Sequence, residues 1–363
     1  MPSVCHVSPT YFAPESILGG GERFAEELAR AMASKVPTKL VSFGPRPSRE
    51  RPAPGFERVI LKSWTRQKMV PFSPRLFREL SGADVIHCHQ YNVLPTFLAC
   101  LWGGLKNRRV FVTDLGGGAW TPGYQIDPSR WVTAFLPVSE YAAAGLRGGR
   151  RPVHVIYGGV DLDRYAMRPA PAGGGRPAAE HDGTLVFLGR ILPHKGIHHL
   201  IAGLAPGIPL HVIGTEIDPG YRERLGRLAA GKAVWFRCGL SDAEIVPYLQ
   251  RAMALVHPTP VDESGSAGVH ELFGLALVEA MACGCPVVAS DAASLPEVVE
   301  HEASGLLVAP NDPAAIGAAV ERLRADATLW RRLSAGARRR VEERFTWERV
   351  VARCLRSYED LRP

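Results

Sequence analysis

Short apolar runs alternate with amphipathic segments along the chain. Runs rich in apolar and β-branched residues, which favour strands, lie at 4–7, 39–42, 58–61, 84–87, 109–113, 135–138, 184–188, 210–213, 233–236, 254–257 and 287–289. Helical spacing separates them, as in residues 22–32, where Phe24, Leu28 and Met32 share one face. Strands that alternate with helices are typical of parallel sheets covered by helices on both faces. The pattern therefore predicts an α/β fold.

This alternation of strands and helices occurs twice, on either side of a stretch that has few large apolar residues. Residues 165–183 contain Pro169, Pro171, Pro177 and a run of three glycines. Such a composition favours a linker with much conformational freedom. We therefore predict one domain at 1–168, a linker at 169–183 and a second domain at 184–345. The 363 residues are enough for two domains of ordinary size.

Composition supports a globular protein made and kept in the cytoplasm. The chain is 46% hydrophobic and 22% charged. Its longest mostly apolar stretch, residues 93–105, is shorter than the ~20 residues that cross a bilayer, and no signal-peptide pattern is present. Seven cysteines are scattered without the paired spacing of a zinc site, so we expect reduced thiols that serve as small core residues.

The net charge of +7 suits anionic partners, which include nucleic acid, an anionic membrane surface and phosphorylated substrates. Arginines are spread along the chain, for example at 147–151 and 338–340, and are not interleaved with aromatic residues. We therefore expect no nucleic-acid partner. Peripheral contact with the inner face of a membrane stays open as a hypothesis.

Two glutamates flank a short helix start in the second half. Residues 275–282 favour helix, Gly284 suits a left-handed stop, and Glu271 precedes the helix while Glu279 lies within it. Phe273, Gly274 and Leu275 stand at the helix start, where unpaired backbone N–H groups and the helix dipole favour an anion. The alternative is an amphipathic surface helix with two solvated glutamates.

Two further segments carry polar groups at predicted strand ends. Arg190 and Lys195, in the run 189–196, follow the first strand of the second domain, at the edge where ligands sit in open α/β sheets. Gly19, Gly20 and Gly21 open the first helix and permit close approach of an anion. A surface turn with two solvated bases is the alternative for the first segment.

These segments resemble those of the retaining family-4 glycosyltransferases of the GT-B fold, also described as glycosyl transferases group 1. The resemblance includes the E-x7-E spacing of residues 271–279, G-R-x4-K-G at 189–196, the passage 157–165 and Phe345-Thr-Trp347. It implies two Rossmann-like domains that face each other across a cleft, each a parallel sheet flanked by helices. The first domain would be the acceptor side and the second the nucleotide-sugar side, with 346–363 returning to the first as a helix.

The resemblance also implies a role for each matching residue. Arg190, Lys195 and Glu271 would be the catalytic set, in which the two cations hold the diphosphate and Glu271 contacts the donor sugar. The donor would further be bound by the glycines 19–21, by Gly214, by backbone groups of Phe273, Gly274 and Leu275, and by Glu279, which would contact the ribose. Many relatives have a histidine at the position of Leu115. Its absence here points to an altered donor, a different acceptor geometry or a role taken by Asp114. His89 is a second candidate for contact with the sugar or acceptor, and a structural histidine is the alternative for it.

The predicted reaction is retaining transfer of a hexosyl unit from a UDP- or GDP-sugar to an acceptor hydroxyl on a sugar, a lipid-linked molecule or a small molecule. The leaving diphosphate would deprotonate the acceptor. We expect no metal and no cofactor apart from the nucleotide-sugar donor, because two cations serve the diphosphate and Asp161 and Asp163 lack further ligands. A nucleotide-sugar epimerase, a sugar phosphorylase and a non-catalytic nucleotide-sugar binding module remain alternatives.

Overall fold

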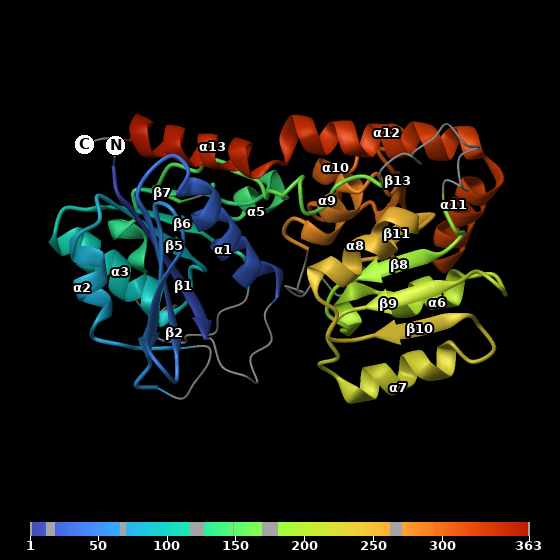
Figure 1. The fold of residues 1–363 in the computed structure, drawn as a ribbon, viewed down its shortest axis with the longest axis horizontal. Helices are drawn as coiled ribbons and strands as arrows, with labels where there is room; N and C mark the ends of the chain where they lie inside the picture. Colours follow the sequence, from blue (N-terminus) through green and yellow to red (C-terminus); the bar gives the residue numbers. More distant parts are fainter. Residues whose placement is uncertain are drawn as a thin grey trace. The chain divides into compact units, whose positions relative to one another are not determined.

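The chain forms two compact units, shown in the computed structural model in Figure 1. The structure describes residues 2–11, 19–65, 70–116, 127–147, 149–168, 181–261 and 271–361. The first unit contains Met1–Gly159 and Trp347–Pro363, and the second contains Val160–Thr346. Residues 160–168, assigned from the sequence to the first domain, therefore belong to the second unit. Most of the predicted linker, 169–180, lies outside the described residues.

A seven-stranded sheet forms the centre of the first unit, in the order β3-β4-β2-β1-β5-β6-β7. Its strands are β1 (Val4–Tyr11), β2 (Thr38–Gly44), β3 (Ser48–Ala53), β4 (Phe56–Lys62), β5 (Val85–His89), β6 (Arg109–Thr113) and β7 (Ala134–Phe135). Its helices are α1 (Gly20–Met32), α2 (Leu76–Ser81), α3 (Leu94–Leu105), η1 (Pro128–Trp131), α5 (Glu140–Ala144) and α13 (Trp347–Asp360). The parallel α/β organisation predicted from the sequence is confirmed for β1, β2 and β4 to β7.

Two details of this sheet differ from the sequence prediction. Strand β3 was not predicted, and it pairs antiparallel with β4. Its residues are mostly exposed, so it has no apolar run to mark it as a strand. The predicted strand at 135–138 is reduced to the two residues of β7. Pro137 cannot donate a backbone hydrogen bond to a neighbouring strand, which limits the pairing.

The second unit has a six-stranded, entirely parallel sheet in the order β10-β9-β8-β11-β12-β13. The strands are β8 (Leu185–Leu188), β9 (Leu210–Ile213), β10 (Val234–Arg237), β11 (Ala254–His257), β12 (Val287–Ser290) and β13 (Leu306–Val308). The helices are η2 (Pro193–Lys195), α6 (Ile197–Gly203), α7 (Pro219–Leu228), α8 (Asp242–Arg251), α9 (Leu275–Ala282), α10 (Leu295–Val298), α11 (Pro313–Ala325) and α12 (Ala327–Arg344). The strand order reverses between β8 and β11, the position where open α/β sheets bind ligands.

Each unit has its own apolar core between its sheet and its helices. In the second unit the core includes Phe187, Leu210, Val256 and Trp330, and in the first unit it includes Val41, Ile86 and Val112. All seven cysteines are free and six are buried, as the sequence predicts. Cys238 is the exception because it is exposed, so the expectation of a core role is wrong for that residue.

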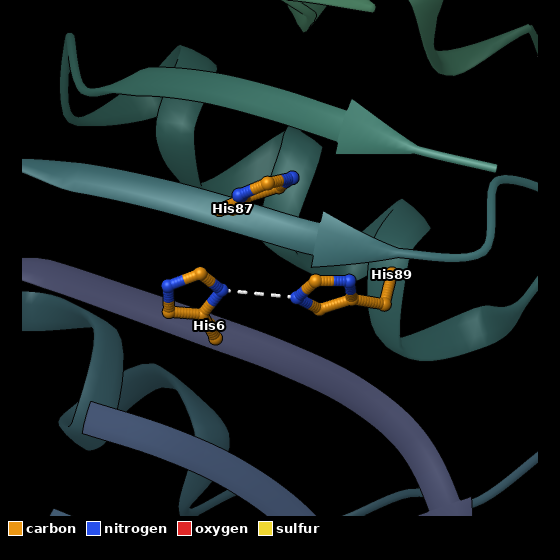
Figure 2. A group of neighbouring side chains, drawn as sticks. All are labelled: His6, His87 and His89. Atoms are coloured by element: carbon orange, nitrogen blue, oxygen red, sulfur yellow. Dashed lines mark hydrogen bonds between the residues drawn. The ribbon is translucent and has the colours of Figure 1, made fainter. Parts of the chain in front are cut away.

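Three buried histidines lie side by side on β1 and β5 in the first unit (Figure 2). His6 pairs in register with His87, and His89 lies two residues further along β5. His87 Nε2 is 2.8 Å from the hydroxyl of Thr113, which itself donates to the carbonyl of Leu136. A hydroxyl has one proton, so His87 must donate from Nε2. Its Nδ1 then accepts from the hydroxyl of Tyr358 at 2.7 Å.

The contacts of this histidine cluster (His6, His87 and His89) fit neutral, hydrogen-bonded rings. His6 Nδ1 lies 3.0 Å from His89 Nε2, and His6 Nε2 lies 3.4 Å from the sulfur of Met32. The ligand nitrogens fall within 4.8 Å of one another, a spacing that a metal ion could use. However, both nitrogens of His87 are already engaged by hydroxyl groups, and its ring is stacked on that of His89. The cluster as arranged is therefore a packing feature of the sheet.

The histidine cluster predicts that acid destabilises the protein. Burial lowers the pKa of His6 and His87 well below the ordinary value, and that of His89 to about 3. The unfolded chain takes up these protons near pH ~6.5, whereas the folded chain does not, so stability is lost as the pH falls below that value. We expect the melting temperature to fall from pH 7.5 to pH 5. The number of protons taken up on unfolding over this range should be lower by about one in His87→Gln than in wild type. His301→Gln, at an exposed histidine, is the control. Parallel curves for wild type and His87→Gln would contradict the prediction.

Gly214 follows β9, where a side chain would collide with the neighbouring loop. A Cβ atom added there would lie 1.7 Å from the carbonyl oxygen of Gly189, which follows β8. The backbone at Gly214 also has φ of 155°. A glycine is therefore required at this position for packing, whatever its role toward a ligand.

Gly214→Ala should therefore lower the free energy of unfolding by about 2 kcal/mol or more, because the backbone must move to admit the methyl group. Gly226→Ala in α7 is a matched control, since its nearest neighbour is the flexible end of Arg222 at 3.4 Å. Chemical denaturation of the full chain measures both changes. Unchanged stability in Gly214→Ala would contradict the packing explanation.

Candidate functional site

The carboxyl edge of the second sheet brings together Lys195, Glu271 and His257. Lys195 ends η2 after β8, His257 is the last residue of β11, and Glu271 lies just before α9. Oε2 of Glu271 is 2.5 Å from Nζ of Lys195 and 2.9 Å from Nε2 of His257. Two residues predicted for the site therefore form an ion pair, although they come from separate segments of the chain. We call Lys195, Glu271 and His257 the Glu271 triad.

The Glu271 triad is largely shielded from water. The side chains of Lys195 and Glu271 are 13% and 15% exposed, and that of His257 is 3% exposed. Burial alone raises the pKa of Glu271, but the charge of Lys195 and the hydrogen bond from His257 outweigh burial and hold that pKa well below its usual range. Glu271 is therefore an ionised carboxylate at neutral pH.

Gly196 fixes the position of Lys195 against the end of β11. It has a left-handed φ of 68°, and a Cβ atom added there would lie 1.8 Å from the carbonyl oxygen of Pro258. The two backbones can approach this closely only because the residue has no side chain. Lys195 and His257 each adjoin one of these two contacting residues, so the backbone contact helps to bring both side chains to Glu271.

The start of α9 lies directly after Glu271. Gly274 caps this helix in a left-handed conformation, and the buried ring of Phe273 packs edge to face on Phe345 with centroids 5.6 Å apart. The hydroxyl of Ser294 donates to the carbonyl of Glu271 at 2.8 Å. These contacts hold the backbone from Phe273 to Leu275 in a defined place, where the first amides of the helix favour a negative group.

Glu279 lies within α9 and its side chain is buried, with 6% exposure. Burial, and then the negative charge of Glu279, raise the pKa of Cys283 to about 12. Glu279 is therefore not a solvated surface glutamate, and the alternative of an exposed amphipathic helix is wrong for this residue. Its predicted contact with a ribose stays a prediction.

Besides burial, Lys195 and Arg190 both lower the pKa of His194, which lies between them in the sequence. Arg190 is exposed. Burial, followed by the charges of Lys195 and Arg190, lowers the pKa of His194 to about 4. Both cations therefore lie near enough to His194 to disfavour its charged form. Gly214 lies against Gly189, next to Arg190, so the packing glycine also belongs to this edge of the sheet.

In the first unit, the predicted glycine loop begins α1. Gly19 caps the helix and its N–H donates to the carboxylate of Glu22 at 2.8 Å, so this amide already has an internal partner. A Cβ atom on Gly21 would lie 3.5 Å from Leu115. Leu115 therefore lies beside the glycine loop. Gly20 is the first residue of the helix.

His89 and Asp114 lie at the same edge of the first sheet, where β5 and β6 end, but they differ in burial. His89 ends β5 with 1% exposure, and its ring meets Phe24 and His6. Asp114 follows β6 and is partly exposed. Burial raises the pKa of Asp114 in spite of hydrogen bonds from backbone amides such as that of Tyr91. Asp114 is thus more open to a ligand than His89, and both roles stay predictions.

Sequence reasoning missed three residues at these edges. His257 contacts Glu271, Ser294 holds the backbone of Glu271, and Gln90 donates to the carbonyl of Gly116 at 2.8 Å with an unusual positive φ of 73°. The available signal was position, because His257 and Gln90 stand at or just after strand ends. Ser294 carried no signal.

Several arginines of α12 form ion pairs with glutamates of the same unit. Arg338 bonds Glu342, Arg340 bonds Glu300, and Arg332 bonds Glu302. Three arginines of α12 therefore have glutamate partners within the protein. In the part of the chain that the structure describes, no helix has the length and apolar character needed to span a bilayer.

Comparison with known proteins gives a consistent match for both halves. The family model for Glycosyltransferase Family 4 matches residues 18–164, and the model for Glycosyl transferases group 1 matches residues 176–340. The alpha-maltose-1-phosphate synthase of Mycolicibacterium smegmatis is 30% identical over 323 residues, which are 76% of this chain and 79% of that protein.

Other relatives match over a shorter part of their length. A D-inositol 3-phosphate glycosyltransferase of Streptomyces bingchenggensis is 32% identical over 249 residues, which cover 58% of this chain and 50% of that protein. The chain spans about half the length of the first such relatives.

The fold agrees with solved structures. Anabaena HepE in complex with UDP has a TM-score of 0.74 at 17% identity, over 99% of this chain and 100% of that one. The predicted GT-B class is confirmed. The paired family models, the identity to the mycobacterial synthase and the two α/β units lead to one conclusion: this chain belongs to the family-4 glycosyltransferases.

Proposed function

We propose that this chain is a retaining glycosyltransferase that moves a hexosyl unit from a UDP- or GDP-sugar to an acceptor hydroxyl. The observation that carries the proposal is the largely shielded ion pair of Lys195 and Glu271 at the carboxyl edge of the second sheet. A shielded carboxylate beside a shielded ammonium group, next to a helix start, can bind a sugar and an anion at neighbouring positions.

The cations at this edge would hold the donor diphosphate. Arg190 is exposed and Lys195 is partly shielded, and both influence His194. The first amides of α9 add fixed donors that favour a negative group. These groups gain strength as negative charge grows on the leaving diphosphate, which is the condition for lowering a reaction barrier.

In the proposed reaction, the bond between the anomeric carbon and the diphosphate oxygen breaks and that oxygen takes the electron pair. The acceptor oxygen forms a new bond to the same carbon on the same face. Its proton passes to the departing diphosphate, so charge and atoms balance. Glu271 orients the sugar hydroxyls and stabilises positive charge that develops on the ring.

A divalent metal is not needed for this scheme, because the two cations serve the diphosphate. Asp161 and Asp163 form a D-x-D sequence of the kind that can bind a metal ion, but Asp161 serves a turn here. It accepts hydrogen bonds from the backbone N–H groups of Asp163 and Arg164, both at 3.0 Å. The proposal therefore includes no cofactor apart from the nucleotide-sugar donor. The UDP complex of HepE supports UDP as the first nucleotide to test.

Acceptor identity is proposed only as a hydroxyl on a sugar, a lipid-linked molecule or a small molecule. The family membership supports transfer, whereas epimerase and phosphorylase reactions would use the same fold. Incubation with UDP-glucose or GDP-mannose, with and without candidate acceptors, should give a glycosylated acceptor and free UDP or GDP. Epimerised nucleotide sugar, or sugar phosphate formed from inorganic phosphate, would replace the proposal with the corresponding alternative.

Removing the Lys195 charge should weaken diphosphate binding specifically. Lys195→Met should lower UDP affinity about 10- to 100-fold, the usual loss for a charged hydrogen bond, while UMP affinity changes little. Calorimetric titration with UMP and UDP measures the difference between the two ligands. Equal affinity of wild type and variant for UDP would contradict the assignment. The melting temperature is measured in parallel, because this variant leaves Glu271 with fewer partners.

Replacement of Glu271 should weaken binding of the donor sugar and leave binding of the nucleotide nearly unchanged. Glu271→Gln should reduce transfer at least about 100-fold and remove the extra affinity of UDP-glucose over UDP, because the amide replaces an ionised acceptor. UDP binding itself should stay within about threefold of wild type. Glu223→Gln, at a 73% exposed glutamate of α7, is the matched control. Full transfer activity in Glu271→Gln would refute the role.

A further inference from the structure

His257 has one defined hydrogen-bonding state in the Glu271 triad. The carboxylate of Glu271 is ionised and can only accept, so the nitrogen at 2.9 Å, Nε2 of His257, must carry the proton. The same oxygen, Oε2, also accepts from Lys195. Among the described residues nothing donates to the second oxygen, Oε1. The triad therefore leaves one oxygen of Glu271 available to a sugar hydroxyl.

A diphosphate would compete with Glu271 for Lys195. One ammonium group can contact both anions only within a narrow range of positions, and a diphosphate carries more charge than a carboxylate. If Lys195 turns toward the diphosphate, Oε2 loses its cation and His257 is the remaining donor. A shielded carboxylate that lost both donors would be destabilised and would tend to take up a proton.

We propose that His257 is a positioning residue that keeps Glu271 ionised and oriented toward the donor sugar while Lys195 holds the diphosphate. This inference rests on the proposed function. His257 would act through Glu271, without contacting the reacting atoms. Its own position is set by the sheet, because it ends a buried strand and pairs in register with Ala289 of β12.

The surroundings of His257 support a fixed ring. Its ring lies parallel to that of Phe187, with an interplanar angle of 9° and centroids 6.2 Å apart. Its Nδ1 is buried and has no hydrogen-bond partner among the residues that the structure describes, as is also true of the Thr259 hydroxyl and Nε2 of His194. Buried polar atoms without partners are uncommon in purely structural regions and often mark a place for water or a ligand. A histidine used only for packing would not need its Nε2 directed at a carboxylate.

Two variants separate hydrogen bonding from packing. His257→Gln places an amide N–H near the former Nε2 and keeps a donor to Glu271, whereas His257→Phe keeps a ring and removes the donor. His211→Gln is the matched control, because His211 also lies on a strand of this sheet and packs against Trp235 and Tyr248. Its Nδ1, like that of His257, is buried and has no hydrogen-bond partner within the described parts of the chain. Melting temperatures of the full chain report any change in folding.

The measured quantity is the ratio of the dissociation constants for UDP and UDP-glucose, or for GDP and GDP-mannose. This ratio reports the contribution of the sugar and needs no acceptor. We expect His257→Phe to reduce the ratio about tenfold with UDP affinity unchanged, and His257→Gln to restore it to within about threefold of wild type. His211→Gln should match wild type.

Each other outcome counts against a specific statement. A wild-type ratio in His257→Phe overturns the positioning role while the proposed function stands. Equal losses in His257→Phe and His257→Gln, accompanied by lower melting temperatures and weaker UDP binding, show a structural role and also overturn it. A wild-type protein that binds none of these nucleotides or nucleotide sugars refutes the proposed function, and the inference with it.

Discussion

The constraint on which the site depends is the cost of burying the carboxylate of Glu271. An ionised group removed from water must have close donors, or it is destabilised by several kcal/mol. Lys195 and His257 supply them at the same oxygen, Oε2. This arrangement ties a loop after β8, the end of β11 and the segment before α9 into one structure. The chemistry proposed for the site follows from that shared oxygen.

The backbone makes the arrangement rigid. Gly196 allows the loop after β8 to touch the carbonyl of Pro258, and Ser294 holds the carbonyl of Glu271. Parallel strands end at the same edge, so residues from distant segments meet without a long excursion of the chain. Side chains placed by packed elements keep their geometry, which is what a site that stabilises developing charge requires. The same rigidity makes this edge sensitive to single glycine substitutions.

Much of the fold could be predicted from the apolar pattern. The strands with buried runs and the helix at 275–282 were recognised because burial on both faces of a parallel sheet demands continuous apolar residues. Strands β3 and β13 were missed. Strand β3 lies at an edge, pairs antiparallel and is mostly exposed, and β13 has only three residues, two of which are partly exposed. Lys195 and Glu271 were recognised through their motifs. His257 was not, since a histidine at the end of a buried strand has the same local pattern whether it packs or positions another residue.

The sequence by itself determined the alternation of strands and helices, the presence of two α/β units and the order of the site segments along the chain. These depend on local periodicity, which is written in neighbouring residues. Only the tertiary structure decided that Glu271 shares one oxygen with Lys195 and His257, that Gly214 is required by packing against Gly189, and that His89 is enclosed with His6 and His87. Such contacts join residues far apart in the chain, and their distances and burial arise only when the sheets form.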